Sequence, residues 1–151
     1  MGETRVVEEV RTSAGLEEAF AYVADFDHQA QWDPNTVTSR RLTEPPVAVG
    51  TRFALEVRMG RGTVPMEYRI TELVPPARVV LVGEGKGIWS EDIIQMRADD
   101  GTTVVTYEAR IRLSGFLGFI QPLLGRAFQG IGRGAAAGLQ RELDRIAAQL
   151  T

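Results

Sequence analysis

The last third of the chain, roughly residues 114 to 150, constrains the fold most, because it predicts one long amphipathic helix. From Leu124 onward, apolar residues recur every three or four positions and so form one stripe along a helix. The members of this stripe are Leu124, Phe128, Ile131, Ala135, Leu139, Leu143, Ile146 and Leu150. Ser114 is expected to cap the helix, and Pro122 predicts a kink or a division into a short lead-in and a long body. Such a helix has to lay its apolar stripe across the rest of the chain.

Three glycines, Gly130, Gly134 and Gly138, fall beside this stripe. Each glycine inside a helix costs about 1 kcal/mol relative to alanine, so some other interaction must offset them. We favour close packing of another segment against the helix. The alternative is that the glycines leave space for a bound molecule.

The composition is that of an ordinary globular protein. The chain has 151 residues, of which 44% are hydrophobic and 25% charged, so we expect residues 1–151 to form a single domain with one core. A net charge of −3 without any basic run argues against a nucleic-acid partner. The absence of cysteine and the single histidine argue against disulfides and metal sites. No transmembrane segment or signal peptide is evident, which predicts a soluble cytoplasmic protein.

The residues before the long helix predict one strand, two helices and six further strands. Residues 5–11 read as a strand, and Ser13 is expected to cap a helix with an apolar face from Leu16 to Ala24. Residues 25–34 predict a short second helix, capped by Asp27 and ended by Pro34. The remaining strands are expected at residues 36–43, 50–59, 63–74, 78–84, 88–98 and 102–113.

The short links between these strands favour an antiparallel meander, because parallel strands need crossovers of a dozen or more residues. Apolar and charged residues alternate along the strands, so one face of the sheet is apolar and the other solvated. The fold class is therefore predicted as α+β, with a seven-stranded antiparallel sheet wrapped around the C-terminal helix. A strongly twisted sheet that grips a helix can leave a cavity between them, and such cavities are common ligand sites.

Several segments resemble the START-like helix-grip (SRPBCC) superfamily, and within it the polyketide cyclase/dehydrase and lipid-transport group. They are "DFDHQAQWDP", "GTRF", "ELVPPARVV", "DDGTTVVTYE" and "GRGAAAGLQRELDRI", and together they extend over nearly the whole chain. The matching positions are architectural: Trp32, Pro34, Gly50-Thr51, Pro75-Pro76, Gly101-Thr102 and Leu139. The resemblance implies a helix-grip fold and a function among ligand carriers, hormone or lipid binders and cyclases. It supplies no shared catalytic motif.

Three polar residues are expected to project into the cavity. Asp92 shares the phase of Ile94 and Met96, and Glu8 shares that of Val6 and Val10. Since the first strand should neighbour the last in this fold, Glu8, Asp92 and Tyr107 could meet. A carboxylate against apolar walls has a raised pKa and can act as acid or base, while a tyrosine can polarise a carbonyl.

That combination would suit proton abstraction next to a carbonyl, as in an aldol-type cyclisation or a dehydration. The alternative, which we favour, is that the carboxylates lie near strand ends in water or are turned away by a bulge.

Histidine and aromatic residues receive more ordinary interpretations. His28 lies on a polar turn, which predicts a surface or helix-capping role. Trp32 and Trp89 are expected in core or rim packing rather than in ligand stacking, and strict alternation places Trp89 out of phase with the apolar face. The cluster Phe116, Leu117, Phe119 and Ile120 is expected to cap the core, with a mobile lid or a partner-binding patch as the alternative.

Three functions are compatible with these patterns. The favoured one is a non-enzymatic binder or carrier of a small apolar molecule such as a lipid, polyketide or aromatic, with Asp92 and Glu8 as its polar anchors. Its expected contacts are Phe53, Met66, Tyr68, Trp89, Asp92, Tyr107, Phe128 and Ile131. The second is a cyclase or dehydratase that uses Asp92, Glu8 and Tyr107. The third is a module that docks a protein or membrane through the apolar residues 116–124.

No cofactor is expected. The glycine pattern of residues 130–135 fits a loose dinucleotide fingerprint, but it lies inside a predicted helix with no strand before it.

Overall fold

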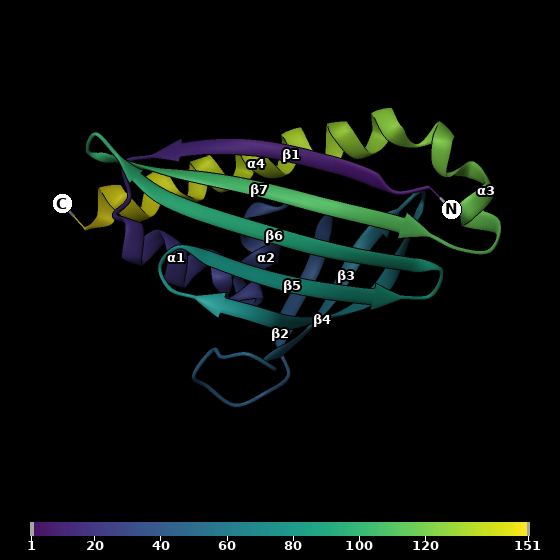
Figure 1. Ribbon diagram of the computed structural model, residues 1–151, viewed down its shortest axis with the longest axis horizontal. Helices are drawn as coiled ribbons and strands as arrows, with labels where there is room; N and C mark the ends of the chain where they lie inside the picture. Colours follow the sequence, from purple (N-terminus) through teal and green to yellow (C-terminus); the bar gives the residue numbers. More distant parts are fainter. Residues whose placement is uncertain (1, 151) are drawn as a thin grey trace.

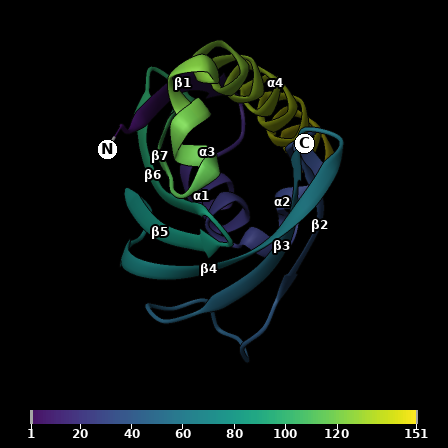
Figure 2. The ribbon, with the colours of Figure 1, turned by 90° about the vertical axis from the view of Figure 1, so that its right-hand side faces the viewer.

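The computed structural model describes residues 2–150, in which seven strands form one antiparallel sheet that curls around a long C-terminal helix (Figures 1 and 2). The strands are β1 (Thr4–Thr12), β2 (Thr36–Arg41), β3 (Arg52–Met59), β4 (Gly62–Val74), β5 (Arg78–Gly85), β6 (Ile88–Asp99) and β7 (Thr102–Leu113). The helices are α1 (Leu16–Ala24), η1 (Phe26–His28), α2 (Gln29–Trp32), α3 (Phe116–Ile120), η2 (Gln121–Leu123) and α4 (Gly125–Gln149). The sheet order is β1-β7-β6-β5-β4-β3-β2, so the first strand pairs with the last. The predicted α+β helix-grip fold is confirmed.

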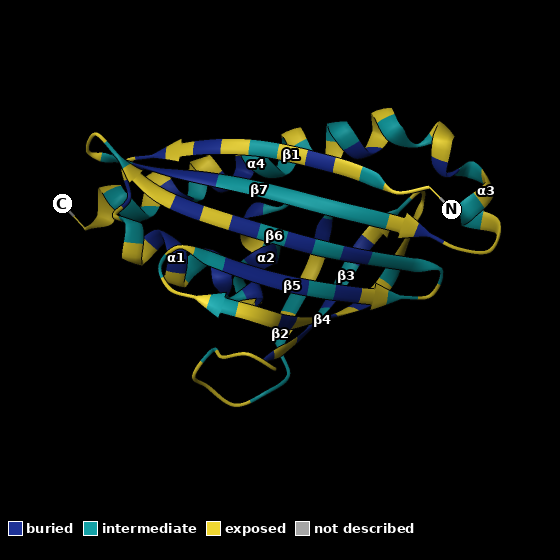
Figure 3. Cartoon of the chain, in the orientation of Figure 1, coloured by how far each residue is buried: buried dark blue, intermediate teal, exposed yellow. Residues whose placement is uncertain are grey.

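The strands form where the predicted alternation places them. In β4, for example, Met66, Tyr68 and Ile70 are buried while Glu67 and Arg69 are exposed. Figure 3 shows the same alternation of buried and exposed positions along the sheet. The β6–β7 hairpin turns at Asp100 and Gly101, whose φ angles of 51° and 82° match the turn type that an Asp-Gly pair favours. The sheet thus presents a buried concave face.

The first two short helices begin differently from the prediction. The residue before α1 is Gly15, so Ser13 does not cap this helix. Asp25 rather than Asp27 caps η1, because the Asp25 carboxylate accepts the Asp27 backbone N–H at 3.1 Å. The Asp27 carboxylate accepts instead from the backbone N–H of Arg41, at 2.8 Å, and so ties the helical segment to β2.

Pro122 divides the C-terminal region as predicted, into the lead-in helices α3 and η2 and the long body α4. Ser114 is not the cap of α3, because Gly115, with a φ of 62°, precedes the helix. The lead-in does not close the core as expected. Phe116 and Phe119 are 77% and 86% exposed, and Ile120 is half-buried. Leu117 does pack, against a small cluster that contains Val6, Leu113 and Phe128.

The apolar stripe of α4 and helices α1 and α2 cover the concave face of the sheet. Leu139 and Leu143 on α4 are fully buried, in one cluster with residues from α1, α2 and most of the strands. Two other members of the stripe, Ile131 and Leu150, remain exposed.

The structure explains why one of the three helix glycines, Gly138, is a glycine. A Cβ on Gly138 would collide with the main-chain carbonyl of Trp32, whereas one on Gly134 would lie 3.7 Å from the Pro34 side chain and one on Gly130 would lie 3.6 Å from that of Arg133. Close backbone approach is thus confirmed at Gly138. Within residues 2–150, no helix is long and apolar enough to cross a membrane.

Candidate functional site in the cavity between sheet and helix

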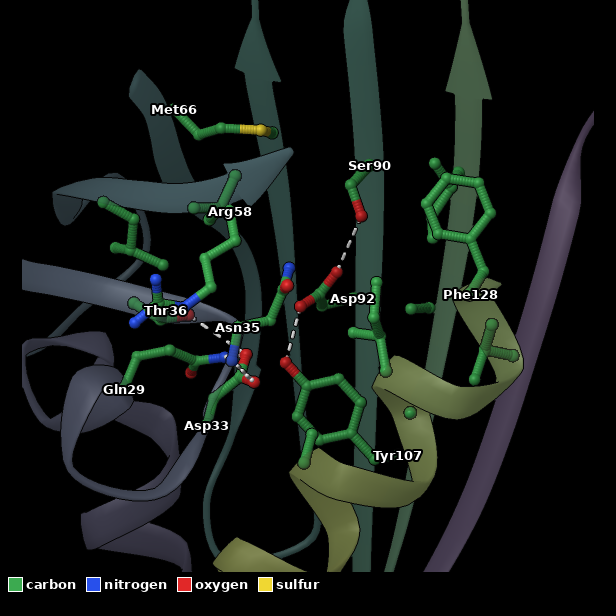
Figure 4. A pocket seen from close by; sticks show the side chains of 18 of the residues that line it. Gln29, Asp33, Asn35, Thr36, Arg58, Met66, Ser90, Asp92, Tyr107 and Phe128 are labelled. Atoms are coloured by element: carbon green, nitrogen blue, oxygen red, sulfur yellow. Dashed lines mark hydrogen bonds between the residues drawn. The ribbon is translucent and has the colours of Figure 1, made fainter. Parts of the chain in front are cut away.

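A cavity of about 420 Å³ lies between the concave face of the sheet and α4. Its α4 wall includes Phe128, Ile131, Ala135 and Leu139, and its sheet wall includes apolar residues of β1, β3, β4, β6 and β7. The close-up in Figure 4 shows polar groups entering from two sides: Gln29, Asp33 and Asn35 from one, Ser90, Asp92 and Tyr107 from the other. Apolar walls with a few polar groups are typical of small-molecule sites.

Asp92 is the centre of the polar group on the sheet side. The alternation of β6 turns Ser90, Asp92 and Ile94 inward, and Asp92 is only 5% exposed. The Tyr107 hydroxyl, on β7, donates to Asp92 Oδ2 at 2.5 Å, and the Ser90 hydroxyl donates to Asp92 Oδ1 at 3.0 Å (Figure 4). The sheet therefore holds an acceptor-rich carboxyl group with two hydroxyl partners inside an apolar cavity.

Burial changes the proton affinity of this group. It raises the pKa of Asp92 from 3.8 to about 6, against the hydrogen bonds from Tyr107 and Ser90, which act in the opposite direction. Burial and then the negative charge of Asp92 raise the pKa of Tyr107 well above its ordinary value. Tyr107 thus stays protonated as a donor, while Asp92 can exchange a proton near neutral pH.

Asp33 forms a second carboxyl site on the opposite wall. It follows α2 and accepts hydrogen bonds from the backbone N–H of Asn35 at 2.9 Å, the Thr36 hydroxyl at 3.0 Å and the Gln29 amide at 3.3 Å. Burial raises the pKa of Asp33, and these three hydrogen bonds oppose that shift. The negative charge on Asp33 also acts to raise the pKa of Asp92.

The predicted grouping of Glu8, Asp92 and Tyr107 is found in part. Glu8 lies opposite Tyr107 in the register of β1 and β7, and all three residues contribute to the cavity wall. Glu8 is half-buried, and within residues 2–150 the hydrogen bonds of the Asp92 carboxylate come from Ser90 and Tyr107 rather than from Glu8. The close pair in the cavity is therefore Asp92 and Tyr107.

Most of the other expected contact residues line the cavity: Met66, Tyr68, Phe128 and Ile131. Two need correction. Phe53 is fully buried but lies outside the cavity wall, because the ring of Phe26 packs against it at a centroid distance of 5.9 Å. Trp89 points away from the concave face, as strict alternation implies, and the Arg112 guanidinium lies 4.3 Å from its ring centroid.

His28 and Trp32 both have packing roles. Trp32 is buried, as expected, and its ring meets that of Tyr107 edge-on at 5.9 Å, so it forms part of the cavity wall. The imidazole of His28 does not cap α2 but stacks on Tyr22 at 4.5 Å, with its Nδ1 2.9 Å from the Tyr22 carbonyl oxygen. Of the expected surface or helix-capping role, the position is found, because His28 is the half-buried N-cap residue of α2, but its side chain makes no capping hydrogen bond.

The sequence pattern did not identify Gln29, Asp33, Asn35 or Arg58 as cavity residues. The first three lie on a short helix and the loop after it, where periodicity gives no direction to a side chain. Arg58 sits on the charged phase of β3 and reaches the cavity rim, where its Nε donates to the Pro34 carbonyl oxygen at 3.1 Å. The positions of Gln29, Asp33 and Asn35 thus depend on the conformation of a short segment between α1 and β2, whereas Arg58 reaches the cavity through the length of its side chain.

The fold and this cavity agree with a family match. Residues 3–150 match the family described as polyketide cyclase / dehydrase and lipid transport, and the chain belongs to that family. No curated protein sequence matches the chain.

Solved structures of the same fold come from proteins of low sequence identity. A START superfamily protein from Mycobacterium smegmatis is 16% identical, with a TM-score of 0.73 and coverage of 99% of this chain and 100% of that one. The Zhui aromatase/cyclase from Streptomyces sp. R1128 is 15% identical, with a TM-score of 0.77 and coverage of 95% of each chain. The di-domain aromatase/cyclase StfQ of the steffimycin pathway is 11% identical, with a TM-score of 0.71 and coverage of 97% and 52%. The family and fold are compatible with ligand binding or with cyclase activity.

Proposed function

We propose that the chain binds or carries a small, largely apolar molecule, such as a lipid, polyketide or aromatic compound, in the cavity between the sheet and α4. The cavity itself carries this proposal: about 420 Å³ of space is enclosed by apolar walls and contains a few convergent polar groups. A cavity of about 150 Å³ accommodates one benzene, so this volume suits a ligand of roughly two or three aromatic rings.

Apolar and polar residues of the cavity wall would contact different parts of the ligand. Met66, Phe128 and Ile131 would contact the apolar body of the ligand, and burial of that surface is the main favourable term. Asp92, Tyr107 and Glu8 would orient any polar substituent. Membership of a family whose description includes lipid transport supports a carrier role.

Native mass spectrometry tests this proposal on protein purified gently from its own host. The measured mass is compared with the mass calculated from the sequence, before and after denaturation. A discrete excess mass that disappears on denaturation is expected and would indicate the ligand class. Host-purified protein with the bare polypeptide mass would count against a stable carrier.

A second candidate function, cyclisation or dehydration of a polyketide, is favoured by one observation. Asp92 has a pKa raised to about 6 and shares a hydrogen bond with Tyr107 inside the cavity. As a carboxylate it could take a proton from the carbon next to a ketone, and the resulting enolate would form a carbon–carbon bond to a second carbonyl carbon. Asp92 would return that proton to the carbonyl oxygen, which becomes a hydroxyl group. Loss of this hydroxyl together with a proton from the neighbouring carbon would release water and leave the carbon–carbon double bond of the unsaturated ring.

The two candidates respond differently to Asp92→Asn with a poly-β-ketone thioester as substrate. An enzyme should lose about 100-fold or more in turnover, since general acid–base catalysis contributes factors of that size. A carrier shows no turnover in either form and changes only in affinity. The aromatase/cyclase assignments of Zhui and StfQ make this the substrate class to try first.

A further inference from the structure

Gln29, Asp33, Asp92 and Tyr107 together form what we call the polar end of the cavity, and this end contains a buried hydrogen-bond acceptor without a partner. Gln29 is only 5% exposed, and within residues 2–150 its Oε1 is the buried side-chain polar atom that lacks a hydrogen-bond partner. Gln29 belongs to the cavity wall, and its side chain extends toward Asp33 (Figure 4). Buried carbonyl oxygens nearly always accept a hydrogen bond, so this position favours a bound group that donates one.

Asp33 determines which end of the Gln29 amide is free. The Gln29 Nε2 donates to Asp33 Oδ2 at 3.3 Å, and the same carboxylate oxygen accepts from the Thr36 hydroxyl. The reverse orientation of the amide would set its oxygen against the Asp33 carboxylate, acceptor against acceptor. The oxygen is therefore the atom left without a partner.

The opposite wall adds a second acceptor. The Asp92 carboxylate faces the same cavity, and its two hydrogen-bond donors, Ser90 and Tyr107, come from its own sheet. Figure 4 shows Asp92 and Tyr107 across the polar end from Gln29 and Asp33. The basic side chain in the wall, Arg58, lies at the rim and already donates to Pro34. The polar end therefore holds two carboxylates, those of Asp33 and Asp92, together with the Gln29 amide.

From this arrangement we infer that the polar end is a subsite for a hydroxyl group, so that the ligand is a neutral apolar molecule bearing an alcohol or phenol. The hydroxyl would donate to Gln29 Oε1 while the apolar body lies between the sheet and α4. A carboxylate ligand is disfavoured there, because it would bring a third negative group beside Asp33 and Asp92. The inference rests on the proposed function and names its ligand class.

Three naphthalene probes of similar size test this subsite at neutral pH. The alcohol 2-naphthol has the donor, 2-methoxynaphthalene replaces it with a methyl ether, and 2-naphthoate carries a negative charge. Isothermal titration of the wild-type protein should give about tenfold tighter binding of 2-naphthol than of the ether, the value of one satisfied buried hydrogen bond. Binding of 2-naphthoate should be weaker than that of 2-naphthol.

Gln29→Leu assigns the effect to this residue. The variant keeps a side chain of similar size without the acceptor, so 2-naphthol should lose its tenfold advantage while the ether binds as before. Full retention of the preference in a folded Gln29→Leu protein would contradict the role of Gln29. The wild-type comparison tests the inference even if that variant does not fold.

The outcomes separate this inference from the proposed function. If the alcohol and the ether bind equally well, the cavity binds apolar molecules but the hydroxyl subsite is wrong. Tighter binding of 2-naphthoate that depends on Arg58 would replace it with an anion subsite. If none of the three probes binds, the proposed function itself fails.

Discussion

The Tyr107 hydroxyl donates a 2.5 Å hydrogen bond to Oδ2 of Asp92, joining neighbouring strands β7 and β6 inside the cavity. The pair keeps a carboxyl group in a place where water does not solvate it. Burial raises the pKa of Asp92 from 3.8 to about 6, so the folded protein holds this proton more tightly than the unfolded chain. This difference links the stability of the fold to pH.

The sign of that link follows from proton counts. Between pH 3.8 and about 6 the folded state binds more protons at Asp92 than the unfolded state, so the free energy of unfolding falls as pH rises. Integrated over this window, the contribution is about 3 kcal/mol. Asp92→Asn should remove it, so that the difference in unfolding free energy between wild type and variant shifts by that amount across the window. Urea unfolding at a series of pH values measures the difference, and a constant difference would contradict the raised pKa.

Tyr107→Phe should raise the pKa of Asp92 further. The hydrogen bond from Tyr107 favours the ionised carboxylate, and the variant leaves Ser90 as its remaining hydroxyl donor. Loss of a hydrogen bond to a charged group should also cost about 1.5–3 kcal/mol of stability. Carbon-detected NMR of the Asp92 carboxyl gives its titration directly. Tyr22→Phe is the matched control, because Tyr22 bonds to Gln31 outside the cavity wall and should leave the Asp92 titration unchanged.

Gly138→Ala should destabilise the protein although alanine is the better helix former. The new Cβ would collide with the Trp32 carbonyl and push the chain that leads to Asp33. A backbone clash of this kind costs about 1–3 kcal/mol or more. Gly134→Ala is the control: its Cβ meets Pro34 at an ordinary 3.7 Å, and it should gain about 0.5–1 kcal/mol. Thermal unfolding measures the stability of both variants. Equal stabilities would show that α4 and α2 are not in close contact.

Phe119→Asp should leave ligand binding intact. Phe119 is 86% exposed and does not belong to the cavity wall, so its replacement should change the affinity for 2-naphthol by less than about twofold and stability by within about 0.5 kcal/mol. The same variant tests the interpretation of residues 116–124 as a docking surface. If they dock to a membrane, Phe119→Asp should abolish cosedimentation with phosphatidylcholine vesicles. A large loss of 2-naphthol affinity would instead make the lead-in part of the cavity.

Periodicity predicts the fold of this chain well because each strand and the long helix bury one continuous face. The alternation of apolar and polar residues in β6 predicts that Asp92 faces inward, and the antiparallel strand order predicts that Tyr107 lies beside it, as the structure has them. The same alternation placed Phe53 inward, but it could not reveal that Phe26 would cover that ring. Inward direction and access to a cavity are separate properties.

The other half of the polar end depends on a segment without periodicity. Gln29 lies on α2 and Asp33 directly after it. Asp25 caps the preceding turn η1, and the main chain of Trp32 packs closely against Gly138. The sequence shows that Gly138 lies in a helix, but it does not show that the main chain of Trp32 packs against it. The exposure of Phe116 and Phe119 was equally hard to predict. Their sequence pattern is typical of core residues, but after the turn at Gly115 their side chains face outward.

The most direct test of a ligand cavity is to fill it. Ala135 on α4 lies in the cavity wall, whereas Ala137 on the same helix is exposed and outside it. Titration with 2-naphthol should show that Ala135→Phe weakens binding by about tenfold or more, the value of roughly 1.4 kcal/mol, while Ala137→Phe binds like wild type. Equal binding by both folded variants would contradict a ligand site between the sheet and α4.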